Sequence, residues 1–182
     1  MEKMRLYIAK TDRYNRKVQK QDGRKLLERA LGSKDYQRIE ILTGAHGKPY
    51  LKNSPKQFNI SHSGEYVVLG FSDTALGVDI QEKRDCRREA IVRRFFAPAE
   101  QEAFDAAEDG RKKDLFYYIW CRKEAYGKYL GVGLQESVLQ KEVCSPIDGC
   151  HFIEYEMDGY QISICCRKEE ELEEVIDLSE GL

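Results

Sequence analysis

Two carboxyl-derived side chains share one short segment of this chain. In the segment GVDIQ (77–81), a β-strand would place Asp79 and Gln81 on the same face, with Cα atoms roughly 7 Å apart. An acidic side chain on a strand's polar face can hold a metal ion. In an isolated segment, an aspartate that faces water or caps a turn is the more common outcome, so the rest of the chain must decide.

A second spacing joins apolar and charged residues. Phe116, Trp120, Glu124 and Lys128 recur every four residues, so a helix would align them along one face. Glu124 and Lys128 could then act together in acid–base chemistry. The alternative is a solvated Glu-Lys pair worth about 0.5 kcal/mol or less, with Trp120 in the core.

The segment FNISHSG (58–64) ends an alternating strand with a histidine between two serines. Hydroxyl and backbone N–H groups at such a turn can bind phosphate, with Ser61 and His62 as the candidate side chains. A lone histidine is more often structural. His46 and His151 have no comparable setting, so they receive no role.

The first half of the chain is rich in predicted strands. Met4, Leu6 and Ile8 alternate with Arg5 and Tyr7, as in a half-buried strand. A predicted helix follows, and its apolar residues are Leu26, Leu27, Ala30 and Leu31. Gly32 is expected to end it. Further strand candidates are IEIL near residue 39, GKPYL, QFNIS, EYVVLGFS and ALGVDI.

After residue 81 the pattern becomes helical and then returns to strands. The predicted helices are REAIVRRFF, PAEQEAFDAAE with Pro98 in its first turn, and DLFYYIWCRKEAYGKYLG ended by Gly131. The strands CHFIEYEM and YQISICC are joined by Asp158-Gly159, which favours a type I′ turn. We expect the acidic tail EEELEEVIDLSEGL to be peripheral, and the element order predicts an α+β fold.

Composition excludes several classes. The 182 residues are 41% hydrophobic and 34% charged with a net charge of -2, which excludes disordered, collagenous and coiled-coil chains. No apolar run reaches the ~18 residues of a membrane span, and the start MEKMRLYIAK lacks signal-peptide features, so we expect a cytoplasmic protein. Six cysteines form no C-x-x-C pair and are predicted to be reduced core thiols.

Several spaced segments together resemble one family. GKPYL (47–51), FNISHSGEYVVLGFS (58–72), GVDIQ (77–81), RRFFAPAEQEAF (93–104) and WCRKEAYGKYLGVGL (120–134) are similar, in this order, to signature segments of the 4′-phosphopantetheinyl transferase superfamily. The likeness is closest to Sfp-type members with W-x-x-K-E-A. It implies an enzyme that transfers phosphopantetheine from coenzyme A to a serine of an apo acyl or peptidyl carrier protein, releasing adenosine 3′,5′-bisphosphate.

The resemblance also implies an architecture. We expect a pseudo-dimer of two similar α/β halves within one chain, residues 1–78 and 79–182, with the site where they meet. Since one chain would then hold a complete site, a monomer is expected. The near-neutral charge argues against nucleic acid as a partner, and no membrane partner is expected.

Roles in catalysis and metal binding follow from the resemblance. Asp79 and Glu124 match the carboxylates that bind Mg²⁺, with Mn²⁺ as the alternative ion. Glu124 also matches the general base for the carrier serine, and Lys128 matches the lysine at the pyrophosphate. Gln81 replaces an acidic residue found in many Sfp-type members. It supplies a carbonyl oxygen without charge, which bears on metal affinity and metal choice, while Glu82 points to the opposite face.

Contacts with coenzyme A are implied in the same way. The positions that match the family's nucleotide and phosphate contacts are Arg24, Lys48, Pro49, Ser61, His62 and Lys128. Only an R-x-L-L pattern supports Arg24. Four further basic residues near it stay unassigned: Arg13, Arg16, Lys17 and Lys20.

A basic cluster could bind an acidic carrier. It consists of Arg87, Arg88, Arg93 and Arg94, with Phe95 and Phe96 beside them. A solvated helix face with two core phenylalanines explains the same residues equally well. Two other functions compete with transfer: a degenerate member that binds coenzyme A or a carrier without turnover, and a nucleic-acid-binding module, which the net charge of -2 disfavours.

Overall fold

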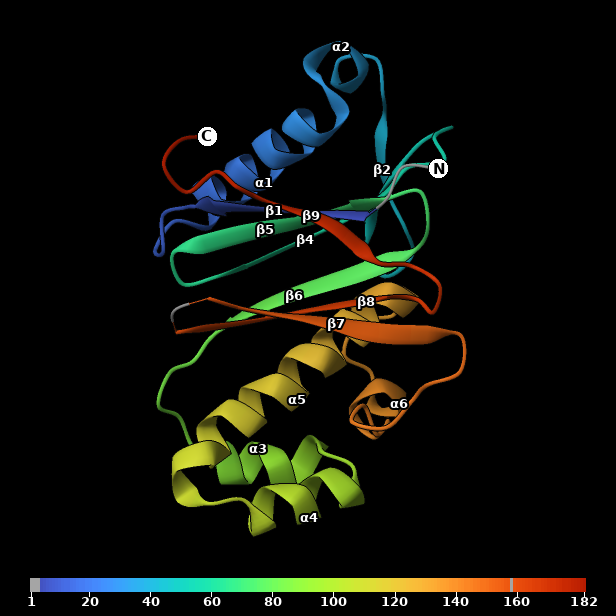
Figure 1. Ribbon diagram of the computed structural model, residues 1–182. Coiled ribbons are helices and arrows are strands. Elements are labelled where there is room, and N and C mark those ends of the chain that lie inside the picture. Colours follow the sequence, from blue (N-terminus) through green and yellow to red (C-terminus); the bar gives the residue numbers. More distant parts are fainter. Residues whose placement is uncertain (1–3, 158) are drawn as a thin grey trace.

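Two sheets lie face to face between two long helices. The computed structural model describes residues 4–157 and 159–182, and Figure 1 shows the four layers. Helix α1 (Arg16–Leu31) covers one sheet and α5 (Asp109–Leu130) covers the other. The first sheet has the order β4 (Gln57–Ser63), β5 (Tyr66–Ser72), β1 (Met4–Lys10), β9 (Leu172–Asp177). The second has the order β6 (Leu76–Glu82), β8 (Tyr160–Arg167), β7 (Cys150–Met157).

The two halves repeat one topology. In each half a first strand leads through helical segments to an antiparallel hairpin, whose second strand pairs antiparallel with the first strand. The order β4-β5-β1 therefore corresponds to β7-β8-β6. This repeat confirms the expected α+β pseudo-dimer. The division between residues 78 and 79 remains a prediction, and it falls within β6.

The main core lies between the two sheets. Alternate residues of β1 and β5 meet alternate residues of β6 and β8 there, among them Met4, Leu6, Ile8, Val68, Val78, Ile80, Ile162 and Ile164. The opposite face of β1 places Tyr7 and Ala9 against Leu26 and Leu27 of α1. Both faces of β1 are therefore covered. Tyr7, which the alternation assigned to a polar face, is buried for this reason.

Helix boundaries follow local signals. Asn15 Oδ1 accepts hydrogen bonds from the backbone N–H groups of Lys17 and Val18 at the start of α1. Gly32 ends α1 with φ 81°, and Gly131 ends α5 in the left-handed conformation with φ 74°. The remaining helices are α2 (Ser33–Tyr36), α3 (Arg88–Phe95), α4 (Pro98–Ala106) and α6 (Glu136–Leu139). A separate hairpin pairs β2 (Ile41–Thr43) with β3 (Pro49–Leu51).

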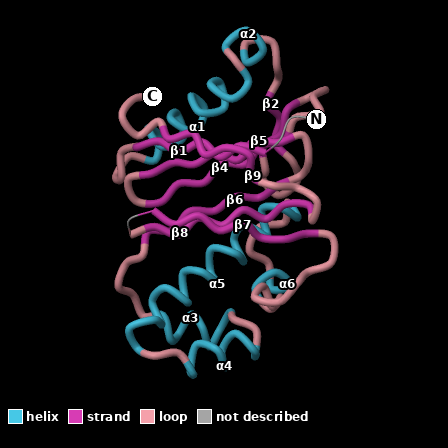
Figure 2. Tube along the Cα trace, viewed as in Figure 1, coloured by secondary structure: helices cyan, strands magenta, loops and turns pink. Residues whose placement is uncertain are grey.

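The acidic tail is not peripheral, contrary to expectation. Its residues 172–177 form β9, which pairs parallel with β1 at the edge of the first sheet (Figure 2). Leu172 and Val175 pack against the core between the sheets, and Ile176 packs toward α1. The expectation was wrong because the acidic composition concealed apolar residues that a parallel partner can bury.

Three smaller expectations concern turns and thiols. The predicted turn residue Asp158 lies outside the described residues, while Gly159 has the positive φ, 72°, that a type I′ turn needs. All six cysteines are free thiols, but the prediction of a core position is wrong for Cys86 and Cys144, which are exposed. Cys165 faces α5, while Cys166 faces the core between the sheets. In the described part of the chain, no helix has the length and apolarity needed to cross a bilayer.

Candidate functional site

The candidate site lies where the edge strands of the two sheets meet. Side chains of β4 bind the free backbone edge of β6: Asn59 Oδ1 accepts a hydrogen bond from Val78 N at 2.8 Å, and Ser63 Oγ accepts one from Glu82 N at 3.0 Å. These contacts replace the partner strand that β6 lacks on this side. They bring Ser61 of β4 next to Asp79 of β6.

Asp79 is a buried carboxylate surrounded by donors, with 2% of its surface exposed. Its Oδ1 accepts hydrogen bonds from Ser61 Oγ at 2.8 Å and from Lys128 Nζ at 2.6 Å. Its Oδ2 accepts one from Gln81 Nε2 at 2.7 Å. Asp79 neither faces water nor caps a turn, so the more common outcome for an isolated segment does not apply here.

Gly77 allows α5 to lie directly on β6. A Cβ at this position would lie 2.1 Å from the carbonyl oxygen of Ala125 and 2.3 Å from the backbone nitrogen of Tyr129. Both distances are far below van der Waals contact, so any other residue would push the helix away. Glu124 and Lys128 are the neighbours of these two residues in sequence. The first glycine of GVDIQ thus sets the approach of both charged side chains to Asp79.

Glu124 is a half-buried carboxylate without a hydrogen bond or ion pair to any described residue. Burial first, and then the negative charge of Asp79, raise the pKa of Glu124 to about 7, although the Lys128 ammonium opposes this. Lys128 donates to Asp79, Ser61 and the carbonyl oxygen of Val78 instead. The solvated Glu-Lys pair considered from the sequence is therefore not what the structure contains.

We call the contact between the edge strands β4 and β6, with the overlying face of α5, the seam. The oxygen ligands at the seam fit a hard divalent cation. Glu124 is unpaired beside a second carboxylate, so a cation between them would relieve the repulsion that raises its pKa. Carboxylate and amide oxygens are ligands that Mg²⁺ accepts. Asp79, Glu124 and the carbonyl oxygen of Gln81 are the side chains that could supply them.

A cavity of about 600 Å³ opens beside the seam on the N-terminal half. Three predicted coenzyme A contacts, Arg24, Pro49 and His62, line it together. Partial burial, and then the positive charges of Lys128 and Arg16, lower the pKa of His62 and so favour its neutral imidazole. The other lining residues are Gln19, Lys20, Leu27, Tyr36, Ile39, Ile41, Thr43, Phe58 and Ile60.

Lys20 is a cavity residue that the sequence analysis left unassigned. Arg16, Lys20 and Arg24 follow one another every four residues along α1, so they share one helix face. This spacing was visible in the sequence. What the sequence lacked was evidence that this face of α1 borders a cavity.

Lys48 lies apart from Arg24, Pro49 and His62. Its Nζ donates hydrogen bonds to the carbonyl oxygens of Leu76 at 2.9 Å and Lys128 at 2.6 Å, and it does not line the cavity. Its ammonium thus joins β6 to the carbonyl end of α5, where a cation is favourable. Burial lowers the pKa of Lys48.

The basic cluster divides between surface and core. Phe96 is fully buried and stacks on Phe116, with ring centroids 5.7 Å apart, so for this residue the core alternative is right. Arg93 pairs with Asp105, whereas Arg94 is exposed above the ring of Phe95 at 5.0 Å. Whether a carrier binds this cluster remains a prediction.

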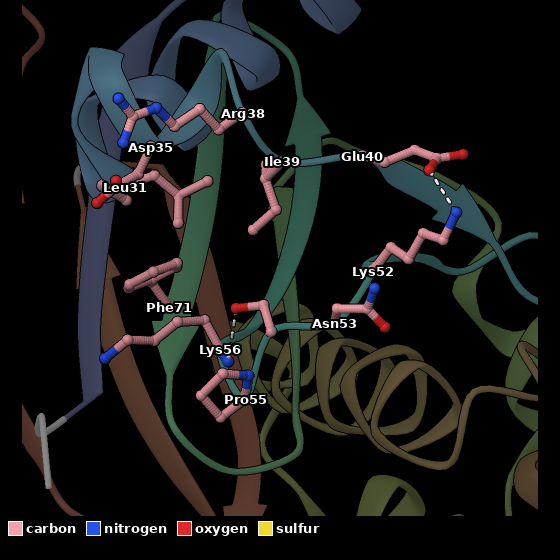
Figure 3. Close-up of a pocket in the computed structure, with 12 residues that line it drawn as sticks. Leu31, Asp35, Arg38, Ile39, Glu40, Lys52, Asn53, Pro55, Lys56 and Phe71 are labelled. Carbon is pink, nitrogen blue, oxygen red and sulfur yellow. Dashed lines mark hydrogen bonds and ion pairs between the residues drawn. The ribbon is translucent and has the colours of Figure 1, made fainter.

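A second cavity, of about 670 Å³, contains none of the predicted site residues. Figure 3 shows its lining between α2 and the segment 52–56, with Ile39 and Phe71 pointing inward. The ammonium of Lys52 is paired with Glu40 at 2.6 Å. The cavity that contains Arg24 and His62, by contrast, brings predicted coenzyme A contacts together.

Comparison with known proteins identifies one family for this chain. Residues 75–176 match the 4′-phosphopantetheinyl transferase superfamily, and residues 2–73 match the family described as 4′-phosphopantetheinyl transferase, N-terminal. The chain is 31% identical to 4′-phosphopantetheinyl transferase Sfp of Bacillus subtilis (strain 168), over 77% of this chain and 70% of that protein. It is 29% identical to 4′-phosphopantetheinyl transferase ffp of Bacillus subtilis, over 85% and 76%. It is 30% identical to 4′-phosphopantetheinyl transferase psf-1 of Bacillus pumilus, over 72% of this chain and 62% of that protein.

Proposed function

Because the chain belongs to the 4′-phosphopantetheinyl transferase superfamily, we propose that the seam between its halves transfers 4′-phosphopantetheine from coenzyme A to a serine of an apo carrier protein. One observation supports this site most directly. Asp79, Ser61, Lys128 and Gln81 form a single hydrogen-bonded group, and the unpaired carboxylate of Glu124 lies on the same side of α5 as Lys128. His62, the neighbour of Ser61 on β4, lines the cavity that also contains Lys20 and Arg24.

Mg²⁺ fits the donors described above, with Asp79 and Glu124 as its protein ligands and Gln81 as a neutral third donor. When bound, the ion would neutralise charge on the pyrophosphate of coenzyme A. The choice of Mg²⁺ over Mn²⁺ is part of the proposal. Oxygen-only ligation fits Mg²⁺ and Mn²⁺ alike, because both ions are hard and accept such donors.

The side chains of this chain divide the remaining work. Glu124 accepts the proton of the carrier serine as the serine oxygen attacks the phosphorus that carries pantetheine. The bond from that phosphorus to the bridging oxygen breaks, and adenosine 3′,5′-bisphosphate leaves with the electron pair. Lys128, already turned toward Ser61 and Asp79, donates to the phosphate oxygens, where negative charge increases. His62 donates a hydrogen bond to the same phosphates, and Ser61 donates one when its hydroxyl turns away from Asp79, which accepts its hydrogen bond at 2.8 Å in the structure.

The cavity beside the seam is the proposed nucleotide site. Arg24 and Lys20 extend along α1 on its charged side, and apolar residues such as Pro49 and Phe58 line the rest. A cation placed against a phosphate makes charge-assisted hydrogen bonds, which are the stronger kind. Lys48, which binds the end of α5, is proposed to order the site rather than to contact the nucleotide.

Replacing Lys20 or Arg24 with alanine is expected to weaken coenzyme A binding. Each substitution removes one cation from the cavity, so KM for coenzyme A should rise about tenfold, while kcat changes little because neither residue reaches the reacting phosphorus. Lys17→Ala is the matched control on the same helix, since Lys17 is exposed and does not line the cavity. Equal KM values for the control and both variants would contradict the assignment.

Gln81→Glu is expected to raise the affinity for Mg²⁺ about tenfold, because ligand charge tunes affinity for such ions. The new carboxylate would lie beside Asp79, where the Gln81 amide now donates at 2.7 Å. Titration calorimetry with Mg²⁺ in the presence of coenzyme A measures the change. Glu82→Gln serves as the control, because Glu82 binds Arg13 and Arg84 on the other face of β6. An unchanged titration for Gln81→Glu would place this side chain outside the metal's ligands.

Intact-mass spectrometry of an apo carrier protein tests the function. The carrier is incubated with this protein, coenzyme A and Mg²⁺, beside one control with EDTA and one carrier whose acceptor serine is alanine. We expect the carrier to gain the mass of one phosphopantetheinyl group, and both controls to lose this gain. Several unmodified carriers, together with measurable binding of coenzyme A, would instead favour the binder without turnover.

Finer properties belong to the same proposal. An acyl or peptidyl carrier is the proposed partner, and the pseudo-repeated halves support a monomer. Six free thiols support a reducing compartment such as the cytoplasm. The mass experiment with carriers of fatty acid, polyketide and nonribosomal peptide synthesis would identify the pathway.

A further inference from the structure

One buried cation of α5 has no part in the proposed mechanism. The side chain of Lys123, immediately before Glu124, is fully buried with 0% of its surface exposed. Its Nζ pairs with Glu100 Oε2 at 2.6 Å, and that carboxylate is also fully buried. Nζ further donates hydrogen bonds to the carbonyl oxygens of Leu139 and Lys141, both at 2.7 Å. All three ammonium protons of Lys123 therefore have acceptors.

Glu100 joins this cation to two other parts of the C-terminal half. Its Oε2 accepts a hydrogen bond from Ala97 N at the start of α4, and its Oε1 accepts one from Val143 N, each at 2.8 Å. The adjacent Arg122 holds the same segment, because its Nη1 donates to the carbonyl oxygen of Val143 at 2.8 Å. Arg122 and Lys123 of α5 thus bind the segment 139–143, and Glu100 connects both Lys123 and this segment to α4.

Stability alone is a weak reason for such a pair. Removing two charges from water costs several kcal/mol for each ion, and apolar residues of similar size are often equally or more stabilising. What a fully satisfied buried pair does supply is a unique geometry, because each charge must keep its partners. A functional group nearby could depend on this geometry.

The neighbouring residue in sequence is that group. Successive residues of a helix are about 100° apart around its axis, so Lys123 and Glu124 point to different sides of α5. Lys123 is held toward α4 and the segment 139–143, while Glu124 lies toward Asp79 of β6. A roll of α5 that moved Glu124 away from Asp79 would pull Lys123 from three acceptors.

We propose that Lys123 and Glu100 are positioning residues, whose buried ion pair sets the roll of α5 and so holds the Glu124 carboxylate against Asp79. Lys123 acts here as a tethered cation that orders the segment 139–143, as a bound metal ion would. The inference rests on the proposed function, because the ion pair matters for turnover only if Glu124 is the general base. It concerns no group that touches substrate.

The test compares three variants by steady-state kinetics of carrier modification. Lys123→Met removes the charge and keeps an unbranched side chain. In Lys123→Met/Glu100→Gln both charges are removed, so no unpaired charge is left buried and the fold is kept even where the single variant is unstable. Lys112→Met is the matched control on α5, because the Lys112 ammonium pairs with the exposed Asp109 and lies 5.8 Å from the centroid of the Phe104 ring, with no buried carboxylate among the described residues as partner.

We expect kcat of Lys123→Met and of the double variant to fall about 10- to 100-fold, the range expected when a reacting group is misplaced by roughly 1 Å. KM for coenzyme A should stay within about twofold, because the cavity belongs to the other half. Thermal unfolding establishes that each assay uses folded protein. A folded double variant with the kcat of the wild type would overturn the positioning role, as would a loss that appears only in KM. A wild type without turnover would contradict the proposed function itself.

Discussion

Replacing Glu124 with glutamine is expected to lower kcat for carrier modification by about 10²- to 10⁴-fold, the usual contribution of a general base. Glutamine keeps the size of the side chain but can neither take the proton of the carrier serine nor neutralise a cation. Since Glu124 has no hydrogen bond or ion pair to a described residue, replacing it with glutamine of the same size breaks no such interaction. Intact-mass kinetics with the wild type at equal concentration measure the loss.

The acidity of Glu124 adds a second signature to this variant. Because the pKa of Glu124 is raised to about 7 and the base must be ionised, kcat/KM of the wild type at low Mg²⁺ should fall as the pH drops below that value. Added Mg²⁺ favours the ionised carboxylate and should move this limb to lower pH. A Glu124→Gln variant with the kcat of the wild type and the same fall of kcat/KM at low pH would show that Glu124 is not the general base.

Stability provides an independent check on the same residue. A carboxyl group whose pKa is higher in the folded than in the unfolded state costs stability as the pH rises from its ordinary value, 4.5, through about 7. Glutamine does not titrate, so Glu124→Gln should gain stability relative to the wild type above pH 7 and not below pH 4. Chemical denaturation at the two pH values measures this difference.

Asp79→Asn is expected to abolish turnover that depends on divalent ions and to weaken Mg²⁺ binding by at least about 100-fold, since a ligand should matter more than the 10–100-fold of its supporting groups. Asparagine preserves the shape of a residue that is 2% exposed, so the fold should survive. Calorimetry with Mg²⁺ and coenzyme A gives the affinity, and circular dichroism gives the fold.

Two features make the Asp79 experiment decisive. Asp114→Asn is a suitable control, because Asp114 is an exposed carboxylate that also pairs with a lysine, Lys83. Lys128 would lose its carboxylate partner in Asp79→Asn, but it is 25% exposed and can be solvated. An active variant whose rate ignores Mg²⁺ would refute Asp79 as a ligand.

The sequence by itself determined the local structure of this protein. Gly32, Pro98 and Gly131 mark helix ends because left-handed caps and first-turn prolines depend on one or two residues. The strand period placed Asp79 and Gln81 on one face, where the two side chains are hydrogen-bonded. The order of the motifs also identified the family, because several short motifs in one order along the chain are more specific than any single motif.

Contacts between distant segments depended on the tertiary structure. Lys128 stands four residues from Glu124, yet it binds Asp79, 49 positions away, because Gly77 lets α5 lie on β6. Packing also turned Lys48 toward α5 and placed Lys20 beside a cavity. These pairings were not readable in advance, since a charged side chain can satisfy its charge with any of several partners of similar energy.

The acidic tail and Lys123 illustrate the same physical reason. Composition suggests that both belong at the surface, because charged residues lose hydration when they are buried. The tail became β9 because β1 offered an unpaired edge, and Lys123 is buried because Glu100 and two carbonyl groups replace its water. Backbone period and turn chemistry are properties of neighbouring residues, whereas burial is a property of the surfaces that meet, and only the folded chain decides which surfaces these are.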